Sequence, residues 1–189
     1  MFNTKAFILL LIISFTSLSV TATELEDGFK AFANGDYQRA MQIWLPLAEK
    51  DNADAQYNIG ILYMKGLGVS ENKRTAFNWY KRAAKLGNTD AMYNLGIMYN
   101  KGKVMIRSPK DAIKWWTKAA ELNNPHAQFN LGVQYAYGRI VRKDTDKAIR
   151  LWLSAAQQGH ADARAALHQV YKDGLFGIPA DQQKARQWK

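Results

Sequence analysis

The chain has 189 residues, of which 48% are hydrophobic and 22% are charged, and its formal net charge is +10. These proportions are those of a chain that folds, so global disorder is excluded. Because the sequence contains no cysteine, disulfides, thiolate metal sites and cysteine nucleophiles are excluded as well. Residues 23–100 hold nine Lys and Arg against nine Asp and Glu, whereas residues 101–189 hold sixteen against seven. Any anionic partner is therefore to be sought at the second half.

Residues 1–22 have the pattern of a secretory signal peptide. One lysine precedes an uncharged, mainly apolar stretch, and Val20–Ala22 supplies a small-x-small cleavage site. We expect cleavage after Ala22 and a periplasmic or secreted protein without a stable membrane span. The alternative is an uncleaved membrane anchor, because the uncharged run approaches the roughly 20 residues that a spanning helix needs. Outside the cytoplasm, nucleic acid is not an expected partner.

A repeat of 36 residues follows this segment. Residues 53–88, 89–124 and 125–160 superimpose without a gap and begin ADAQYNIGILYMKG, TDAMYNLGIMYNKG and PHAQFNLGVQYAYG. Residues 161–189 form a partial last unit that needs one inserted residue, and residues 23–52 form a shorter leading unit. Periods of this length are typical of solenoids that stack one supersecondary unit on the next.

Each unit is predicted to contain two helices, because small, aliphatic and aromatic residues recur every four positions in its first half. Left-handed glycines are expected to end the first helices, and N-cap residues to begin the second helices. The glycines are Gly66, Gly102, Gly138 and Gly174, and the caps are Asp36, Asn72, Ser108, Asp144 and Asp181. Pro46 is expected to kink the second helix of the leading unit.

All six tryptophans fall at two equivalent positions of the second helices. This helical spacing favours packing in a core over a ligand-binding aromatic cluster. Opposite them, glycine recurs inside the first helices at Gly60, Gly96 and Gly132. Because glycine in a helix costs about 1 kcal/mol relative to alanine, we expect a close helix contact at each of these positions.

The sequence offers little for catalysis or metal binding. Of the three histidines, only His160 and His168 are near each other in sequence, and no carboxylate lies at metal-ligand spacing from them. His126 stands alone. Signatures of serine hydrolases and of paired catalytic carboxylates are absent from the sequence. We therefore predict no enzyme activity, no metal and no cofactor.

The pattern A-x-x-N-[LI]-G-x-x-Y-x-x-G, followed by A-x-x-W-[YW]-x-x-A-A, resembles the Sel1-like repeat family, which is related to tetratricopeptide repeats. The resemblance covers about 165 of the 189 residues. It implies an all-α, right-handed α/α solenoid of about five helix-turn-helix pairs, in which each unit buries its apolar stripe against its neighbours. His168, which replaces the helix glycine of the last unit, departs from the pattern.

Tetratricopeptide arrays line their concave face with the first helices, and this resemblance implies a binding surface with two repeating features. An aromatic residue lies beside an asparagine, whose amide can hold a peptide backbone or can bond a neighbouring helix. The predicted partner-binding residues are Tyr57, Asn58, Tyr93, Asn94, Phe129 and Asn130. A basic edge, suited to phosphate or carboxylate groups or else simply solvated, comprises Lys101, Lys103, Arg107, Lys110, Arg139, Arg142 and Lys143.

The expected function is that of a non-enzymatic scaffold or adaptor that binds a protein partner on its concave surface. One alternative is a cell-wall binder with weak hydrolytic action on muropeptides or β-lactams, as the resemblance to cysteine-rich secreted relatives implies, although this chain has no cysteine. The other alternative is a binder of an anionic envelope component, a polysaccharide or a lipid, through the basic half.

Overall fold

The structure, a computed structural model, describes residues 23–102, 104 and 106–189. The predicted signal peptide and Lys103 lie outside the described residues. Within these ranges the chain is helical and has no strand, and consecutive helices pack against one another in pairs. This confirms the predicted all-α architecture of helix pairs. The chain divides into two compact units, the first ending at Asn88 and the second comprising Thr89–Lys189.

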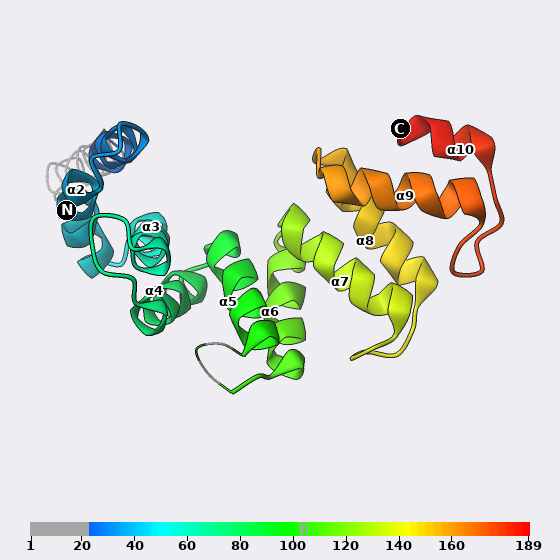
Figure 1. Ribbon diagram of the computed structural model, residues 1–189, viewed down its shortest axis with the longest axis horizontal. Helices are drawn as coiled ribbons and strands as arrows, with labels where there is room; N and C mark the ends of the chain where they lie inside the picture. Colours follow the sequence, from blue (N-terminus) through cyan, green and yellow to red (C-terminus); the bar gives the residue numbers. More distant parts are fainter. Residues whose placement is uncertain (1–22, 103, 105) are drawn as a thin grey trace, which may run out of the picture. The chain divides into compact units, whose positions relative to one another are not determined.

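Figure 1 shows the helices of both units. In the first unit a helix over residues 23–33 precedes α2 (Tyr37–Glu49), α3 (Ala53–Lys65) and α4 (Lys73–Lys85). The second unit contains α5 (Thr89–Lys101), α6 (Pro109–Glu121), α7 (Pro125–Tyr137), α8 (Thr145–Gln157), α9 (Ala161–Asp173) and α10 (Gln182–Gln187). The helices α3, α5, α7 and α9 are the first helices of their repeats, and each packs on the second helix that follows it.

The predicted helix ends are confirmed. All five predicted N-cap side chains accept a hydrogen bond from the backbone N–H three residues later. The four predicted glycines that follow the first helices have φ between 64° and 71°, in the left-handed region that favours glycine. Helix α2 continues through Pro46 to Glu49.

In the leading unit and the three full repeats, an aromatic ring of the second helix packs against the glycine of the first helix. A Cβ atom added to Gly132 would lie 2.5 Å from Nε1 of Trp152. The indole N–H donates to the carbonyl oxygen of Phe129 at 3.1 Å, so the ring is held on the helix by a hydrogen bond as well as by packing. The same seating pairs Gly28 with Trp44, Gly60 with Tyr80 and Gly96 with Trp116. The expected close helix contact is therefore present.

The tryptophans divide into two groups by their position in the second helix. Those that lie over the glycines are buried, with 1% to 2% of their surface exposed: Trp44, Trp116 and Trp152. The other three, one position earlier in their repeats, are only half-buried: Trp79, Trp115 and Trp188. Because one helical position turns a side chain by about 100°, these rings do not point at the glycine of the paired helix. The predicted core packing is complete only for the first group.

The last repeat ends differently from the others. Helix α10 has 6 residues, and His168, at the position of the helix glycine, donates from Nδ1 to the carbonyl oxygen of Ala185 at 2.8 Å. In the last repeat this hydrogen bond between the two helices takes the place of the aromatic ring that packs on the glycine in the other repeats. Because so short a helix is unstable alone in water, we expect amide hydrogens of residues 175–189 to exchange much faster than those of residues 109–157. Equal protection would contradict this prediction.

Candidate binding site on the second unit

The structure distributes the six predicted partner-binding residues over both units. Tyr57 and Asn58 lie on α3 in the first unit, and the other four lie on α5 and α7 in the second. Asn58 is buried, with 6% of its surface exposed, so its side chain cannot reach a bound peptide in this conformation. Tyr93, Asn94, Phe129 and Asn130 are partly exposed, and they form the candidate surface of the second unit.

Tyr93 and Asn130 join two first helices. The Asn130 side chain on α7 hydrogen-bonds the hydroxyl of Tyr93 on α5. Burial raises the pKa of Tyr93, because it penalises the phenolate, and the hydrogen bond from Asn130 opposes this shift. This bond corresponds to the second reading of the repeated asparagine, in which its amide bonds a neighbouring helix.

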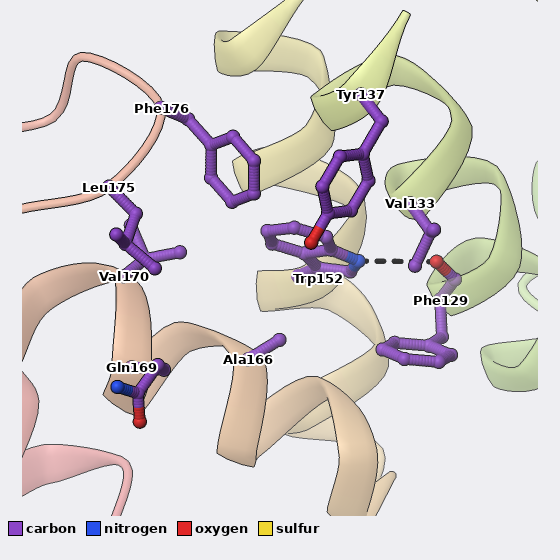
Figure 2. Close-up of a pocket in the computed structure, with 9 residues that line it drawn as sticks. All are labelled: Phe129, Val133, Tyr137, Trp152, Ala166, Gln169, Val170, Leu175 and Phe176. Carbon is purple, nitrogen blue, oxygen red and sulfur yellow. Dashed lines mark hydrogen bonds between the residues drawn. The ribbon is translucent and has the colours of Figure 1, made fainter. Parts of the chain in front are cut away.

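An apolar pocket of about 320 Å³ opens beside Phe129 (Figure 2). Helices α7, α8 and α9 and the loop after α9 supply its lining: Phe129, Val133, Tyr137, Trp152, Ala166, Gln169, Val170, Leu175 and Phe176. The buried indole of Trp152 is fixed by its hydrogen bond to Phe129. Of the predicted site residues in the described chain, Phe129 is the one that lines this pocket.

Phe176 closes one end of the pocket from the loop between α9 and α10. Its φ is 57°, a left-handed conformation that is unfavourable for a bulky residue and is often associated with functional sites. The hydroxyl of Thr145 donates to the Phe176 carbonyl at 3.1 Å, and the Phe176 ring packs edge-on against Tyr137 with centroids 5.2 Å apart. Sequence reasoning missed Phe176, although the residue inserted into the last repeat marks this loop.

The predicted basic edge falls into two groups of described residues. Lys101, Arg107 and Lys110 flank the turn between α5 and α6, where Arg107 Nε donates to the carbonyl of Asn100 at 3.0 Å. Arg139, Arg142 and Lys143 are exposed between α7 and α8. The Arg139 guanidinium lies 5.0 Å from the Tyr137 ring centroid, and Lys143 Nζ lies 6.0 Å from that of Phe176. Two cations of the second group therefore contact the pocket's aromatic rim.

His126 and His160, which are far apart in sequence, are neighbours in the structure. His160 Nε2 lies 3.0 Å from His126 Nδ1, a contact that the sequence analysis did not predict. The reason is a contact that recurs inside each full repeat. It joins the last residue of the repeat, which precedes the next first helix, to the second residue, which lies in the first turn of the repeat's own first helix. In the other repeats an asparagine donates to an aspartate at this place: Asn88 to Asp54 at 2.8 Å and Asn124 to Asp90 at 2.7 Å.

The histidine pair also caps α9. His160 Nδ1 accepts a hydrogen bond from the Ala163 N–H, so the neutral ring carries its proton on Nε2 and donates it to His126. Burial lowers the pKa of His160, and the nearby His126 lowers it further, against an opposing contribution from Asp162. A proton added to His160 Nδ1 would remove the cap.

We therefore predict that low pH destabilises the second unit at the contact between His126 and His160. The unfolded imidazole binds a proton near its ordinary pKa of about 6.5. The folded ring binds it only at lower pH, so stability is lost as pH falls below the unfolded pKa. The melting temperature should fall more between pH 7.5 and 5.5 for the wild type than for the double variant His126→Asp, His160→Asn, which restores the pair of the other repeats. Equal slopes would contradict the prediction.

Neither a metal centre nor a membrane span is found in the part of the chain that the structure describes. Among these residues, no group of three or more His, Cys, Asp or Glu side chains could hold a metal ion. None of the described helices combines the length and apolar character needed to cross a membrane.

The comparisons with known proteins agree on family and fold. The Sel1 repeat model matches residues 53–88, 89–124, 125–160 and 161–188. A Sel1 repeat protein from Oxalobacter formigenes is 34% identical with a TM-score of 0.81, over 87% of this chain and 66% of its own. A protective antigen of uropathogenic Escherichia coli with an SLR fold is 26% identical with a TM-score of 0.76, over 89% of this chain and 37% of its own.

Helicobacter pylori cysteine-rich protein B is 22% identical with a TM-score of 0.55, over 76% of this chain and 96% of its own, and this likeness shows the fold alone. No curated protein matches the sequence. The chain spans less than two thirds of the Oxalobacter and Escherichia proteins, at 66% and 37% of their lengths. Together these matches confirm the α/α solenoid fold class.

Proposed function

Because the chain belongs to the Sel1 repeat family, whose members generally scaffold protein–protein interactions, we propose that it is a non-enzymatic scaffold that binds a protein partner on the first helices of its second unit. The observation that carries this proposal is the apolar pocket beside Phe129. A concave apolar site next to a few polar groups is the usual form of a binding site. Stacked repeats provide such extended binding surfaces.

In this proposal the partner contributes an extended segment that crosses α5, α7 and α9. Asn94 would bond its backbone, because a side-chain amide has both donors and an acceptor. One apolar side chain of the segment would enter the pocket against Phe129 and Ala166. Asn58 is left out of the surface because it is buried.

Site-specific photocrosslinking in the native cells tests the proposal. A photoreactive phenylalanine analogue is placed at Gln169, an exposed residue of α9 that lines the pocket, or at Arg150, which is exposed on α8. We expect a discrete covalent adduct of one partner from position 169 and none of that partner from position 150. The same adducts from both positions, or none from position 169 in a folded variant, would overturn the proposed surface.

We further propose that residues 1–22 direct the chain out of the cytoplasm and are removed. The support is the sequence pattern of one lysine, an apolar stretch and the Val20–Ala22 cleavage site. The intact mass of the protein from the native envelope or medium should correspond to a chain that begins at Thr23. A mass that includes Met1 would contradict cleavage and favour the anchor.

The proposed absence of enzyme activity is tested against the cell-wall alternative. Purified protein is incubated with a chromogenic β-lactam and, separately, with a muropeptide mixture. We expect no turnover above that of a heat-unfolded control. Turnover that is lost on unfolding would favour the cell-wall hydrolase instead.

A further inference from the structure

Two cations lie at one end of the pocket of the second unit. Tyr137 and Phe176 form that end, and their rings meet at 88°. Figure 2 shows both rings beside the Trp152 indole, with Phe129 at the other end of the pocket. The Phe176 and Trp152 centroids are 6.0 Å apart, so the aromatic wall continues from the buried core to the surface.

The two cations at this rim are held over the rings that form it. Arg139 lies over Tyr137 at 5.0 Å and Lys143 lies over Phe176 at 6.0 Å. Among the residues that the structure describes, neither cation forms an ion pair with a carboxylate. Their charges are therefore available to a ligand. An exposed ion pair is weakened by the conformational entropy that its side chains lose on pairing, and stacking on the rings has already removed part of this freedom.

From this arrangement we propose that the pocket selects an acidic peptide segment, in which an apolar side chain fills the pocket and a carboxylate one residue away contacts Arg139 and Lys143. The inference rests on the proposed scaffold function and specifies the partner's chemistry. A ligand with an apolar side chain but no carboxylate leaves the two cations unpaired. A ligand with a carboxylate but no apolar side chain leaves water in the apolar pocket. The combination satisfies both parts of the site.

The positive φ of Phe176 is consistent with this assignment. Loop residues 174–177 hold the Phe176 ring against Tyr137 rather than in solvent, and the Thr145 hydroxyl fixes the strained backbone. Such strain persists where the surrounding structure enforces it, commonly at ligand sites. Without this ring the pocket would lose both its end wall and the surface on which Lys143 stacks.

A peptide array provides the test. Each ten-residue peptide carries, within a Gly/Ser context, one variable position (Phe, Leu or Ala) followed by a second (Asp, Asn or Lys). We expect Phe and Leu to bind better than Ala, and Asp to bind about three- to tenfold better than Asn, as two partly exposed ion pairs allow. The affinity of the best peptide is then measured in solution by isothermal titration calorimetry.

Two variants give the decisive comparison. The charge reversal Arg139→Glu with Lys143→Glu should invert the preference from Asp to Lys and leave the preference for Phe over Ala unchanged. Ala166→Leu should abolish binding of all peptides by filling the pocket, whereas Ala165→Leu, on the exposed surface of the same helix, should not. Circular dichroism confirms that each variant folds.

The proposal is overturned if no peptide binds, if the reversed variant still prefers Asp, or if the array shows no preference at the apolar position. A concentration-dependent dimer that Ala166→Leu disrupts would instead make a second copy of the chain the occupant and also overturn it. The crosslinking experiment distinguishes this proposal from the proposed scaffold function. An adduct from position 169, together with an array in which no peptide binds, leaves the scaffold proposal intact and refutes only the acidic segment.

Discussion

Gly132→Leu is expected to lower the free energy of unfolding by about 1 to 3 kcal/mol, as overpacking of a close contact does. The added Cβ alone would lie 2.5 Å from Trp152 Nε1, a distance that requires the ring or the helix to move. If the ring moves, the hydrogen bond to the Phe129 carbonyl is lost as well, at about 0.5 to 1.5 kcal/mol. Chemical denaturation followed by circular dichroism measures the change.

The effect should extend beyond the repeat that carries the substitution, because the pocket and α9 pack on Trp152. Arg150→Leu is the matched control, since it places leucine at an exposed position of the partner helix α8 and should change stability by no more than about 0.5 kcal/mol. In a further variant, Trp152→Leu combined with Gly132→Ala should recover part of the loss relative to Gly132→Ala alone. If the Gly132→Leu protein is as stable as the control, the absence of a side chain at position 132 is not required for the packing of Trp152.

The features that sequence predicted best were those fixed by a few neighbouring residues. Two examples are the N-cap Asp144 and the left-handed Gly138 at the end of α7, whose roles depend only on local backbone geometry. A single such residue would have been a weak signal, but residues of the same kind occur at the same position in several repeats. The seat of Trp152 on Gly132 could be inferred in the same way, because both partners repeat. Periodicity thus converted residue preferences into a prediction of helix packing.

Features that depend on a departure from the repeat were not predicted. The contact between His126 and His160 spans 34 residues. It is recognisable only after the contact between Asn124 and Asp90 shows that the last residue of a repeat meets the second residue of the same repeat. The pocket likewise requires Phe176, whose place is set by an irregular loop. The sequence predicted a binding surface on the first helices, but it could not show which asparagine is buried or bonded to a neighbouring helix.

The two partly exposed asparagines are expected to carry much of the affinity for an extended partner. Asn94→Ala combined with Asn130→Ala should weaken capture of the crosslinked partner about five- to a hundredfold, because each lost hydrogen bond costs about 0.5 to 1.5 kcal/mol. Helix content should not change, since both side chains lie at the surface of their helices. Binding kinetics of the purified partner on immobilised protein measure the effect.

Tyr93→Phe distinguishes the two ways in which Asn130 can act. This substitution removes the hydroxyl that Asn130 bonds and leaves the amide in place. If the amide holds the partner directly, Tyr93→Phe should leave affinity unchanged or raise it, because the amide is then released to bind. If Asn130 acts only by joining α5 to α7, Tyr93→Phe and Asn130→Ala should weaken binding equally, and the direct contact is refuted.

Charge reversal at the turn between α5 and α6 supplies the contrasting case. Reversing the exposed Lys101, Arg107 and Lys110 should lower mainly the association rate, and high salt should remove the difference from the wild type, since exposed charges steer encounters and are screened. The asparagine pair should instead raise the dissociation rate at every salt concentration. The opposite outcome is that the asparagine variant binds like the wild type while the charge reversal abolishes binding at all salt concentrations. In that case the partner is held by the basic residues and not by the first-helix surface.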